Sequence, residues 1–421
     1  MTNYLELRLP DDPTMAYCHY PIEREFPREE YQLRIDSARR AMRGADIDAL
    51  VITSSAIGRW FTGATEPHSW HDKVASRLTL YILTPDADYL YITPTNNHNF
   101  ATSRRMTWVS DVREIVERTE WPRVEIWGLG QIRQIFAELG IEAARLGFEL
   151  GDTMTLGMNF NDFCALRTEL KRAEFVDASP ILRRLMAIQT PLEIERVRKA
   201  CRAGQWIHER LPEILRSGMT ERALFECLAE VFRESFGKDY GYRPEGGWDV
   251  RNQRDNDYNL YHGVVTDRPF RAGDLICRGT SGASYLGYPG DIDRIWYLGD
   301  PPTVVLTSYR KVWECNRRMA EAIRPGATCS DIYAASAAVE RKFGGRIGRS
   351  GRRGHGLRNT GGLSVHPDNH TVLEPGMIIS VEPMFGDADG FFDLEDQYLV
   401  TDHGRECLHD PAPEDLPCIG A

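Results

Sequence analysis

Two aspartates separated by one residue, Asp291 and Asp293, precede an aromatic run typical of a β-strand and are the first candidates for chemistry. Side chains two residues apart on a strand face the same side of the sheet, so both carboxylates would project together. Carboxylates are the ligands that hard divalent cations prefer, and they also hold cationic substrate groups through charge-assisted hydrogen bonds. The pair therefore predicts either a metal site or a surface that binds a positively charged substrate.

Three histidines and two glutamates further along the chain could move protons: His262, His355, His366, Glu382 and Glu395. Imidazole exchanges a proton near neutral pH. If these side chains converge, they would supply an acid, a base and an orienting group without a metal ion. Each also has a structural explanation when taken singly, because a lone histidine is usually a hydrogen-bonded structural group.

Aromatic residues occur near these positions and could surround a cationic substrate. The same residues are more often part of a hydrophobic core. Arg358 has two explanations as well, since it could contact substrate or pair with the carboxylates. The candidates for substrate binding beside the two aspartates are Trp60, Phe61, His68, His71, Tyr258, Tyr261 and Arg358.

The elements before residue 185 predict an α/β unit. Apolar residues from Pro27 to Arg43 have helical spacing, and they lead into an apolar run of strand length at 48–54. Two further runs, 78–83 and 89–94, are joined by a turn-forming segment and predict a hairpin. Helices around 129–139 and 158–170 and a strand at 145–150 complete the unit.

A helix start marks the boundary to a second domain. Thr190 is a predicted N-cap, Pro191 follows at the first helical position, and Glu193 completes a capping box. The predicted domains are 1–187 and 188–421. The second is predicted as α+β, with two helix layers against a curved antiparallel sheet; its helices are expected at 191–216, 219–235, 303–323 and 329–342, and its strands near 260–300 and 377–408.

Composition excludes several classes of protein. The net charge of −11 argues against a nucleic-acid or anionic-membrane partner, because such partners need clustered Lys and Arg. No window reaches the roughly 18 apolar residues of a membrane span, and the polar, acidic start differs from a signal peptide. The nine cysteines are scattered without a CxxC motif, which predicts reduced thiols and a cytoplasmic protein.

The motifs around the candidate residues occur in the order of a known family. Along the chain they are Gly287-Tyr288, Asp291-Ile292-Asp293-Arg294, Gly354-His355-Gly356, Ser364-Val365-His366-Pro367, the run 373–383 and Asp393-Leu394-Glu395-Asp396. Together they resemble the catalytic domain of the creatinase/prolidase/methionine aminopeptidase (M24) family. The segment from Phe26 also resembles the N-terminal domain of creatinase and prolidase. The resemblance implies an α/β N-terminal domain plus an α+β pita-bread C-terminal catalytic domain. It also implies a homodimer in which the partner's N-terminal domain covers the site.

The resemblance further implies five metal ligands in the chain order Asp, Asp, His, Glu, Glu. The last four fall on Asp291, His355, Glu382 and Glu395. The first falls on Thr280, whose neutral hydroxyl lacks the charge and oxygens that two neighbouring cations need. We therefore expect no cofactor. The alternative is a single divalent metal ion, with Asp293 as the substitute ligand beside the other four.

The incomplete ligand set favours a hydrolase of a small non-peptide carbon–nitrogen bond, of amidine, guanidine or amide type. This enzyme would be creatinase-like and metal-independent. His262 would move a proton between water and the leaving nitrogen, assisted by the other histidines. Glu382 and Glu395 would hold the substrate. An excess of carboxylates without a metal ion favours a cationic substrate.

Three alternatives remain open. A lyase would resemble the iron-dependent dimethylsulfoniopropionate lyase branch, although the extra aspartates of that branch fall here on Gly279 and Ser281. A metallopeptidase of the Xaa-Pro dipeptidase type would use an altered metal site. An inactive binding protein would keep the fold without turnover.

Overall fold

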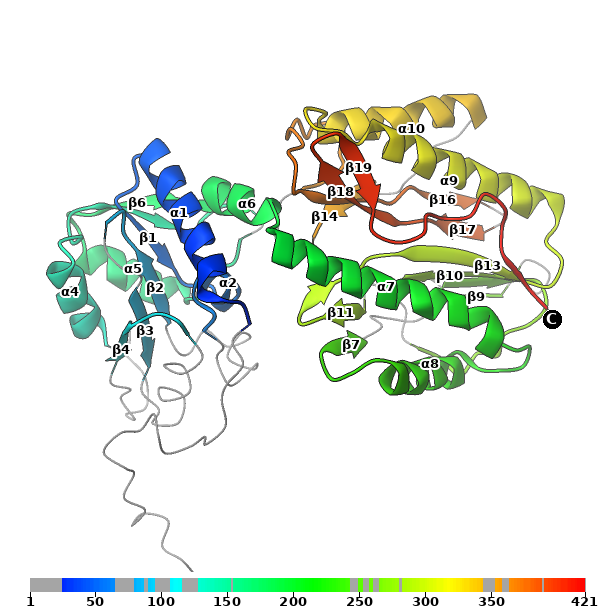
Figure 1. Ribbon diagram of the computed structural model, residues 1–421, viewed down its shortest axis with the longest axis horizontal. Coiled ribbons are helices and arrows are strands. Elements are labelled where there is room, and N and C mark those ends of the chain that lie inside the picture. The colour runs from blue at the N-terminus through cyan, green and yellow to red at the C-terminus, as the bar shows by residue number, and fades with distance from the viewer. Residues whose placement is uncertain are drawn as a thin grey trace, which may run out of the picture. The chain divides into compact units, whose positions relative to one another are not determined.

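The chain forms two compact units, Met1–Leu185 and Met186–Ala421 (Figure 1). The computed structural model describes residues 25–64, 79–86, 90–94, 107–115, 128–152, 154–242, 249–252, 257–259, 265–279, 282–343, 353–357, 363–387 and 390–420. Within these residues, no helix has the length and apolar composition needed to cross a membrane.

The N-terminal unit contains a mixed six-stranded sheet in the order β4-β3-β2-β1-β5-β6. Its strands are β1 (Ala49–Ile52), β2 (Leu80–Leu83), β3 (Leu90–Pro94), β4 (Asp111–Ile115), β5 (Arg145–Phe148) and β6 (Glu174–Asp177). Its helices are α1 (Arg28–Gly44), α2 (Ser55–Thr62), α4 (Leu129–Glu138), α5 (Phe160–Glu169) and α6 (Ser179–Ala187). The core is formed by apolar residues of β1, β2 and β5 with those of α4 and α5.

The predicted helix at 27–43 and the predicted hairpin are confirmed, since β2 and β3 pair antiparallel with Tyr81 opposite Tyr91. The strands β4 and β6 were not predicted. β6 is only four residues long and no residue in it is buried, so it lacks the apolar signal that identifies a strand.

The C-terminal unit begins with the long helix α7 (Pro191–Ile214), and the predicted capping box is confirmed. The Thr190 side chain accepts from the Glu193 backbone N–H, and the Glu193 carboxylate accepts from the Thr190 backbone N–H at 2.9 Å. The remaining helices of this unit are α8 (Glu221–Ser235), α9 (Thr303–Ala322) and α10 (Cys329–Phe343).

Two sheets of the C-terminal unit position the candidate residues. The five-stranded sheet has the order β20 (Cys418–Ile419), β13 (Asp293–Leu298), β10 (Asp274–Gly279), β8 (Asp249–Asn252) and β9 (Asp257–Asn259). The four-stranded sheet has the order β14 (Gly354–Gly356), β15 (Ile378–Val381), β18 (Asp396–Thr401) and β19 (Gly404–Cys407). Smaller sheets contain β7 (Tyr240–Tyr242), β11 (Ala283–Tyr285) and β12 (Tyr288–Pro289), and β16 (Met384–Asp387) with β17 (Gly390–Asp393).

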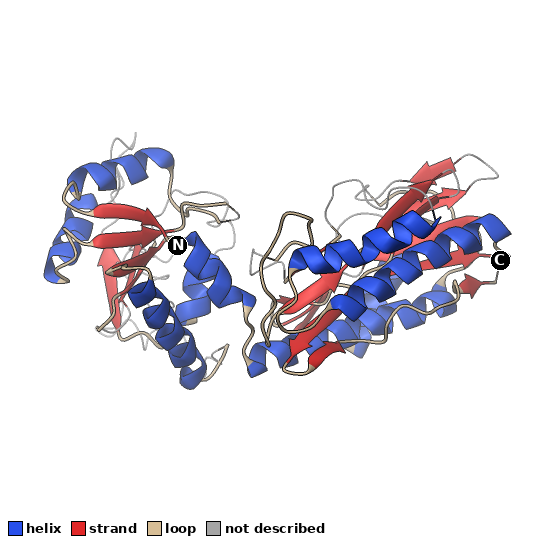
Figure 2. Cartoon of the chain, turned by 90° about the horizontal axis from the view of Figure 1, so that it is seen from above, coloured by secondary structure: helices blue, strands red, loops and turns tan. Residues whose placement is uncertain are grey.

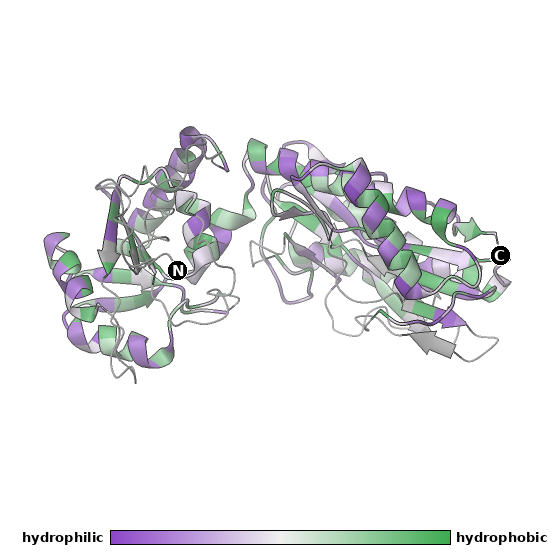
Figure 3. Cartoon of the chain, turned by 90° about the horizontal axis from the view of Figure 1, so that it is seen from below, coloured by the Kyte–Doolittle hydropathy of each residue, from purple (hydrophilic) through white to green (hydrophobic). Residues whose placement is uncertain are grey.

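Helices cover both faces of the five-stranded sheet. Ile276 and Trp296 pack with residues of α7 and α8, whereas Leu275 and Tyr297 point to the other face and pack with α9. This alternation follows from the two-residue repeat of a strand. The long helices lie beside the strands of this unit (Figure 2), and the visible ones carry both hydrophilic and hydrophobic residues along their length (Figure 3). The predicted arrangement of two helix layers is therefore confirmed.

Candidate functional site

Five carboxylates and one imidazole gather where strands of the two sheets meet. Asp293 begins β13, and its backbone exchanges hydrogen bonds of 3.2 and 3.3 Å with that of Glu395, which lies between β17 and β18. This bridge joins the edge of one sheet to the strand that leads into the other. We call the five carboxylates the acid cluster: Asp291, Asp293, Glu382, Asp393 and Glu395. Its members are at most 4% exposed.

His355, in the middle of β14, is the histidine that contacts the acid cluster. Its Nε2 lies 3.3 Å from Glu395 Oε1, 3.5 Å from Asp291 Oδ2 and 3.9 Å from Glu382 Oε2. Its Nδ1 lies 2.7 Å from the carbonyl oxygen of Gly356. A carbonyl oxygen only accepts hydrogen bonds, so Nδ1 carries the proton, and a neutral ring presents the lone pair of Nε2 to the carboxylates.

The six side chains form two groups that could hold a metal ion. One consists of Asp291, His355 and Glu395, and the other of Asp293, Glu382 and Asp393; within each group the ligand atoms lie within 4.8 Å of one another. The sequence analysis missed Asp393 as a site residue. Its position two residues before Glu395 repeats the spacing that identified Asp291 and Asp293, and this signal could have found it.

The negative charge of the acid cluster is visible in the protonation of Glu395. Burial raises the pKa of the Glu395 carboxyl well above its usual range, and the charges of the other four carboxylates raise it further. A positive charge placed among these groups would relieve the repulsion. The cluster is thus suited to a metal ion, a cationic substrate group, or both.

The donor set fits the divalent metal ions that the family resemblance implies. Buried carboxylate oxygens with one imidazole nitrogen are suitable ligands for ions such as Mn²⁺, Fe²⁺ or Zn²⁺. The expectation of no cofactor rested on the missing carboxylate at position 280. Asp293 and Asp393 supply two carboxylates in its place, so the ligand count no longer favours a site without metal.

Gly354 allows β14 to bring His355 to this position. It has φ of +144°, and an added Cβ would lie 2.0 Å from the backbone oxygen of Ser380. Gly404, with φ of +150°, has no atom within 4 Å of such a Cβ. We predict that Gly354→Ala destabilises the protein by about 2 kcal/mol more than Gly404→Ala, because both incur backbone strain and only the first adds a clash. Equal losses in urea unfolding would contradict this explanation.

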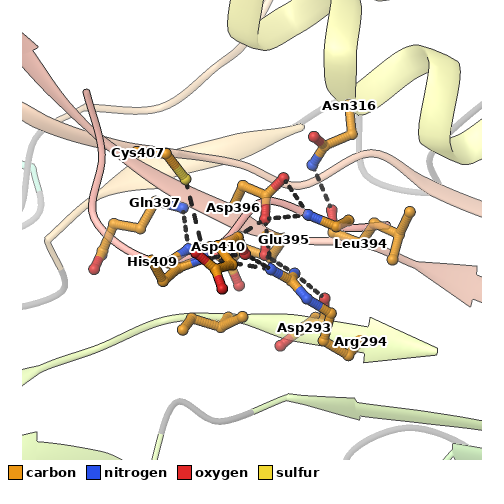
Figure 4. Close-up of polar contacts among 12 residues, drawn as sticks. Asp293, Arg294, Asn316, Leu394, Glu395, Asp396, Gln397, Cys407, His409 and Asp410 are labelled. Atoms are coloured by element: carbon orange, nitrogen blue, oxygen red, sulfur yellow. Dashed lines mark hydrogen bonds and ion pairs between the residues drawn. The ribbon is translucent and has the colours of Figure 1, made fainter. Parts of the chain in front are cut away.

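Arg294 supports the backbone of the acid cluster from behind (Figure 4). Its Nη1 donates to the carbonyl oxygens of Asp293 at 2.8 Å and Glu395 at 2.9 Å. Its Nη2 donates to Asp396 Oδ1 at 2.9 Å and to the carbonyl oxygen of Asp410 at 2.7 Å. The guanidinium therefore makes its ion pair with Asp396 and holds the two acidic residues through their main chain.

His409 extends this buried network and gives it a pH dependence. Its Nε2 accepts from the Gln397 backbone N–H at 3.0 Å, which requires an unprotonated nitrogen. Burial lowers the pKa of His409 from 6.5 to about 4. Its protonation in the unfolded chain therefore reduces stability as the pH falls from 6.5 towards 4, by about 3 kcal/mol in total.

The variant His409→Gln tests this contribution. We expect the difference in unfolding free energy between wild type and variant to shrink steadily as the pH is lowered from 7 to 4. Measuring the difference cancels the titration of all other groups. A difference that stays constant over this range would show that His409 titrates alike in both states.

The other predicted site residues have different surroundings. The side chain of His366 is 37% exposed, and its Nδ1 accepts from the Asp368 backbone N–H at 3.3 Å. Within the described part of the chain, its contacts are thus with its own loop rather than with the acid cluster. Phe61 is fully buried in the N-terminal unit, so its assignment to substrate binding is wrong and it belongs to the core. Trp60 is partly buried, with the Arg34 guanidinium 4.9 Å from its ring centre.

Several predicted residues cannot be compared with the structure because they lie outside what it describes. Tyr258 has a described backbone, which pairs with Arg251 in β9 and β8, but not a described side chain. The residues outside the described ranges are His68, His71, Tyr261, His262, Thr280 and Arg358. Their roles stay predictions.

Known proteins resemble this chain over both units. Residues 34–188 match the creatinase/prolidase N-terminal domain, and residues 195–402 match metallopeptidase family M24. A probable dipeptidase PepE of Mycobacterium tuberculosis is 31% identical over 249 residues, which is 55% of this chain and 62% of that protein. The match thus spans less than two thirds of that dipeptidase. An ectoine hydrolase of Halomonas elongata is 27% identical over 417 residues, covering 91% of this chain and 96% of the relative.

Solved structures show the same fold. The crystal structure of dipeptidase PepE from Mycobacterium ulcerans superposes with a TM-score of 0.76 at 22% identity, covering 94% of this chain and all of that one. At this identity the likeness concerns the fold alone. It confirms the predicted fold class, an α/β N-terminal domain followed by an α+β pita-bread domain. The chain belongs to metallopeptidase family M24, and it carries the N-terminal domain of the creatinase and prolidase members.

Proposed function

We propose that this chain hydrolyses a carbon–nitrogen bond in a small non-peptide molecule that carries an amidine or guanidine group. The observation that carries the proposal is the acid cluster, five buried carboxylates around a single described imidazole. Amidinium and guanidinium groups are planar cations whose N–H groups match carboxylates in charge and geometry. A site with this surplus of negative charge would select them over neutral or anionic molecules.

The similarity to the ectoine hydrolase supports the same substrate class. Its alignment extends over 91% of this chain and thus over both units, whereas the alignment with the mycobacterial dipeptidase covers 55%. Ectoine contains a cyclic amidine, and creatine, the substrate of creatinase, contains a guanidine. Both present a carbon atom bonded to two or more nitrogens, so one acidic site could serve either chemistry.

The residues of the cluster have distinct roles in this proposal. Glu382 and Glu395 hold the N–H groups of the substrate, and His355 orients both carboxylates through its Nε2. A divalent cation bound by the two ligand groups would polarise the bond to be broken and lower the pKa of water. The proton transfer assigned to His262 remains a prediction. Metal independence is not retained, because Asp293 and Asp393 offset the missing ligand on which it depended.

Assembly and location stay at the level of expectation. From the family resemblance we propose a homodimer that binds a small molecule, without a nucleic-acid or membrane partner. Light scattering coupled to size-exclusion chromatography tests the dimer. The cytoplasmic location is a proposal from the scattered cysteines.

A substrate panel tests the function. Purified protein is incubated with ectoine, creatine, a Xaa-Pro dipeptide and dimethylsulfoniopropionate, with and without added Mn²⁺. Ring opening, urea, proline and dimethyl sulfide are then measured separately. We expect turnover of an amidine or guanidine compound that is lost in Glu382→Gln. Release of proline alone would identify a dipeptidase, release of dimethyl sulfide a lyase, and no product with any compound would favour a binding protein.

A further inference from the structure

We propose that Asp293 and Asp393 replace the ligand missing at position 280, so that with Glu382 they form a second cation position beside Asp291, His355 and Glu395. The chain would then bind two divalent cations through a ligand set of its own. The inference concerns the same site as the proposed function but does not depend on the substrate.

The backbone places Asp293 next to the position that lost its carboxylate. In the antiparallel pair of β10 and β13, Asp293 lies directly opposite Gly279, the residue before Thr280 in the sequence. A carboxylate on β13 can therefore reach the space that a carboxylate at position 280 would serve from the neighbouring strand. Gly279 has no side chain to occupy that space.

Asp393 approaches the same space from another strand. It is the last residue of β17, pairs with Met384 of β16, and is fully buried. Oxygen atoms of Asp393, Asp293 and Glu382 all lie within 4.8 Å of one another. Three buried carboxylates at such separations repel one another strongly unless protons or a cation intervene.

The orientation of His355 is an independent indication of a cation. Because Nδ1 donates to the carbonyl oxygen of Gly356, the lone pair of Nε2 faces the acid cluster. A ring nitrogen held in this way by a hydrogen bond at the opposite nitrogen is typical of metal-ligating histidines. Glu395 Oε1, 3.3 Å from Nε2, accepts no hydrogen bond from the described residues and lies in a side chain that is 2% exposed.

Glu382 connects the two groups. It belongs to the group of Asp293 and Asp393, and its Oε2 lies 3.9 Å from His355 Nε2 in the other group. A carboxylate between two cations reduces their mutual repulsion. Two divalent ions would leave one negative charge among the five ionised carboxylates, which a monocationic amidinium or guanidinium group would balance.

Metal stoichiometry tests the inference without any assay of turnover. The full-length protein is stripped with a chelator, reconstituted with Mn²⁺ and passed over a desalting column, and bound manganese is counted by mass spectrometry. We expect two ions per chain in wild type and one in Asp293→Asn and in Asp393→Asn, with second-ion affinity reduced at least about tenfold. Asp368→Asn, at an exposed carboxylate beside His366, is the control and should keep two.

Thermal melting separates a lost ligand from a misfolded variant. Without metal, both asparagine variants should melt at or above the wild-type temperature, because each removes one of several repelling charges. With Mn²⁺ their rise in melting temperature should be smaller than that of wild type. A wild-type protein that binds fewer than two ions, or either variant retaining both at wild-type affinity, would overturn the inference. That result would leave the proposed hydrolysis to be judged by the substrate panel.

Discussion

Replacing His355 by alanine is expected to reduce turnover by about 10²- to 10⁴-fold, the range that positioned acid–base groups contribute. The imidazole lies between Asp291, Glu382 and Glu395 at 3.3 to 3.9 Å and links the two ligand groups. Its loss removes a nitrogen ligand and the group that orients two carboxylates. The measurement is kcat and KM on the substrate found in the panel, together with bound manganese.

Two other histidines provide the comparison for His355→Ala. His403 lies exposed in the turn between β18 and β19, so His403→Ala should retain wild-type activity. His366 contacts its own loop, and we expect His366→Ala to cost less than His355→Ala. If His366→Ala were the more damaging, the catalytic imidazole would be His366, and the contacts of His355 would serve structure alone.

The second large effect is expected on stability. Arg294→Met should lower the free energy of unfolding by about 3–5 kcal/mol, because it leaves the buried carboxylate of Asp396 without its ion partner. The two side chains are 9% and 0% exposed and lie 2.9 Å apart. Arg294 also holds the carbonyl oxygens of Asp293 and Glu395, so the same variant should bind less metal. Urea unfolding monitored by tryptophan fluorescence gives the stability.

Matched variants isolate the buried charge from the lost packing. Arg294→Met/Asp396→Asn should recover much of the loss, since asparagine still accepts the Ala412 backbone N–H without an unpaired charge. Arg222 forms an ion pair of 2.9 Å with Asp267, with side chains 50% and 74% exposed. Arg222→Met should therefore cost at most about 1 kcal/mol. A double variant no more stable than the single one would place the loss in packing instead of charge.

Local patterns were sufficient for much of the fold. The capping box from Thr190 to Glu193 specified the start of α7, because its hydrogen bonds lie within four residues. The amphipathic spacing from Pro27 to Arg43 specified α1 for the same reason. Motif order then identified the fold class, and Asp291, His355, Glu382 and Glu395 were recognised as members of one site.

The composition of the site, in contrast, depended on which strands meet. The sequence alone showed the loss of a carboxylate at position 280 and the two-residue spacing of Asp291 and Asp293, but not where other acids would lie. The bridge between Asp293 and Glu395 brings the end of β17 into the site and with it Asp393.

The same long-range contacts decided the role of two other side chains. Arg294 could have neutralised the acid cluster, yet it pairs with Asp396, 102 residues away, on the far side of the strand. His366 follows the segment that pairs with His355, but its ring contacts Asp368. Periodicity along one strand tells which side chains share a face. Hydrogen bonding between distant strands decides which faces meet, and only the tertiary structure contains that information.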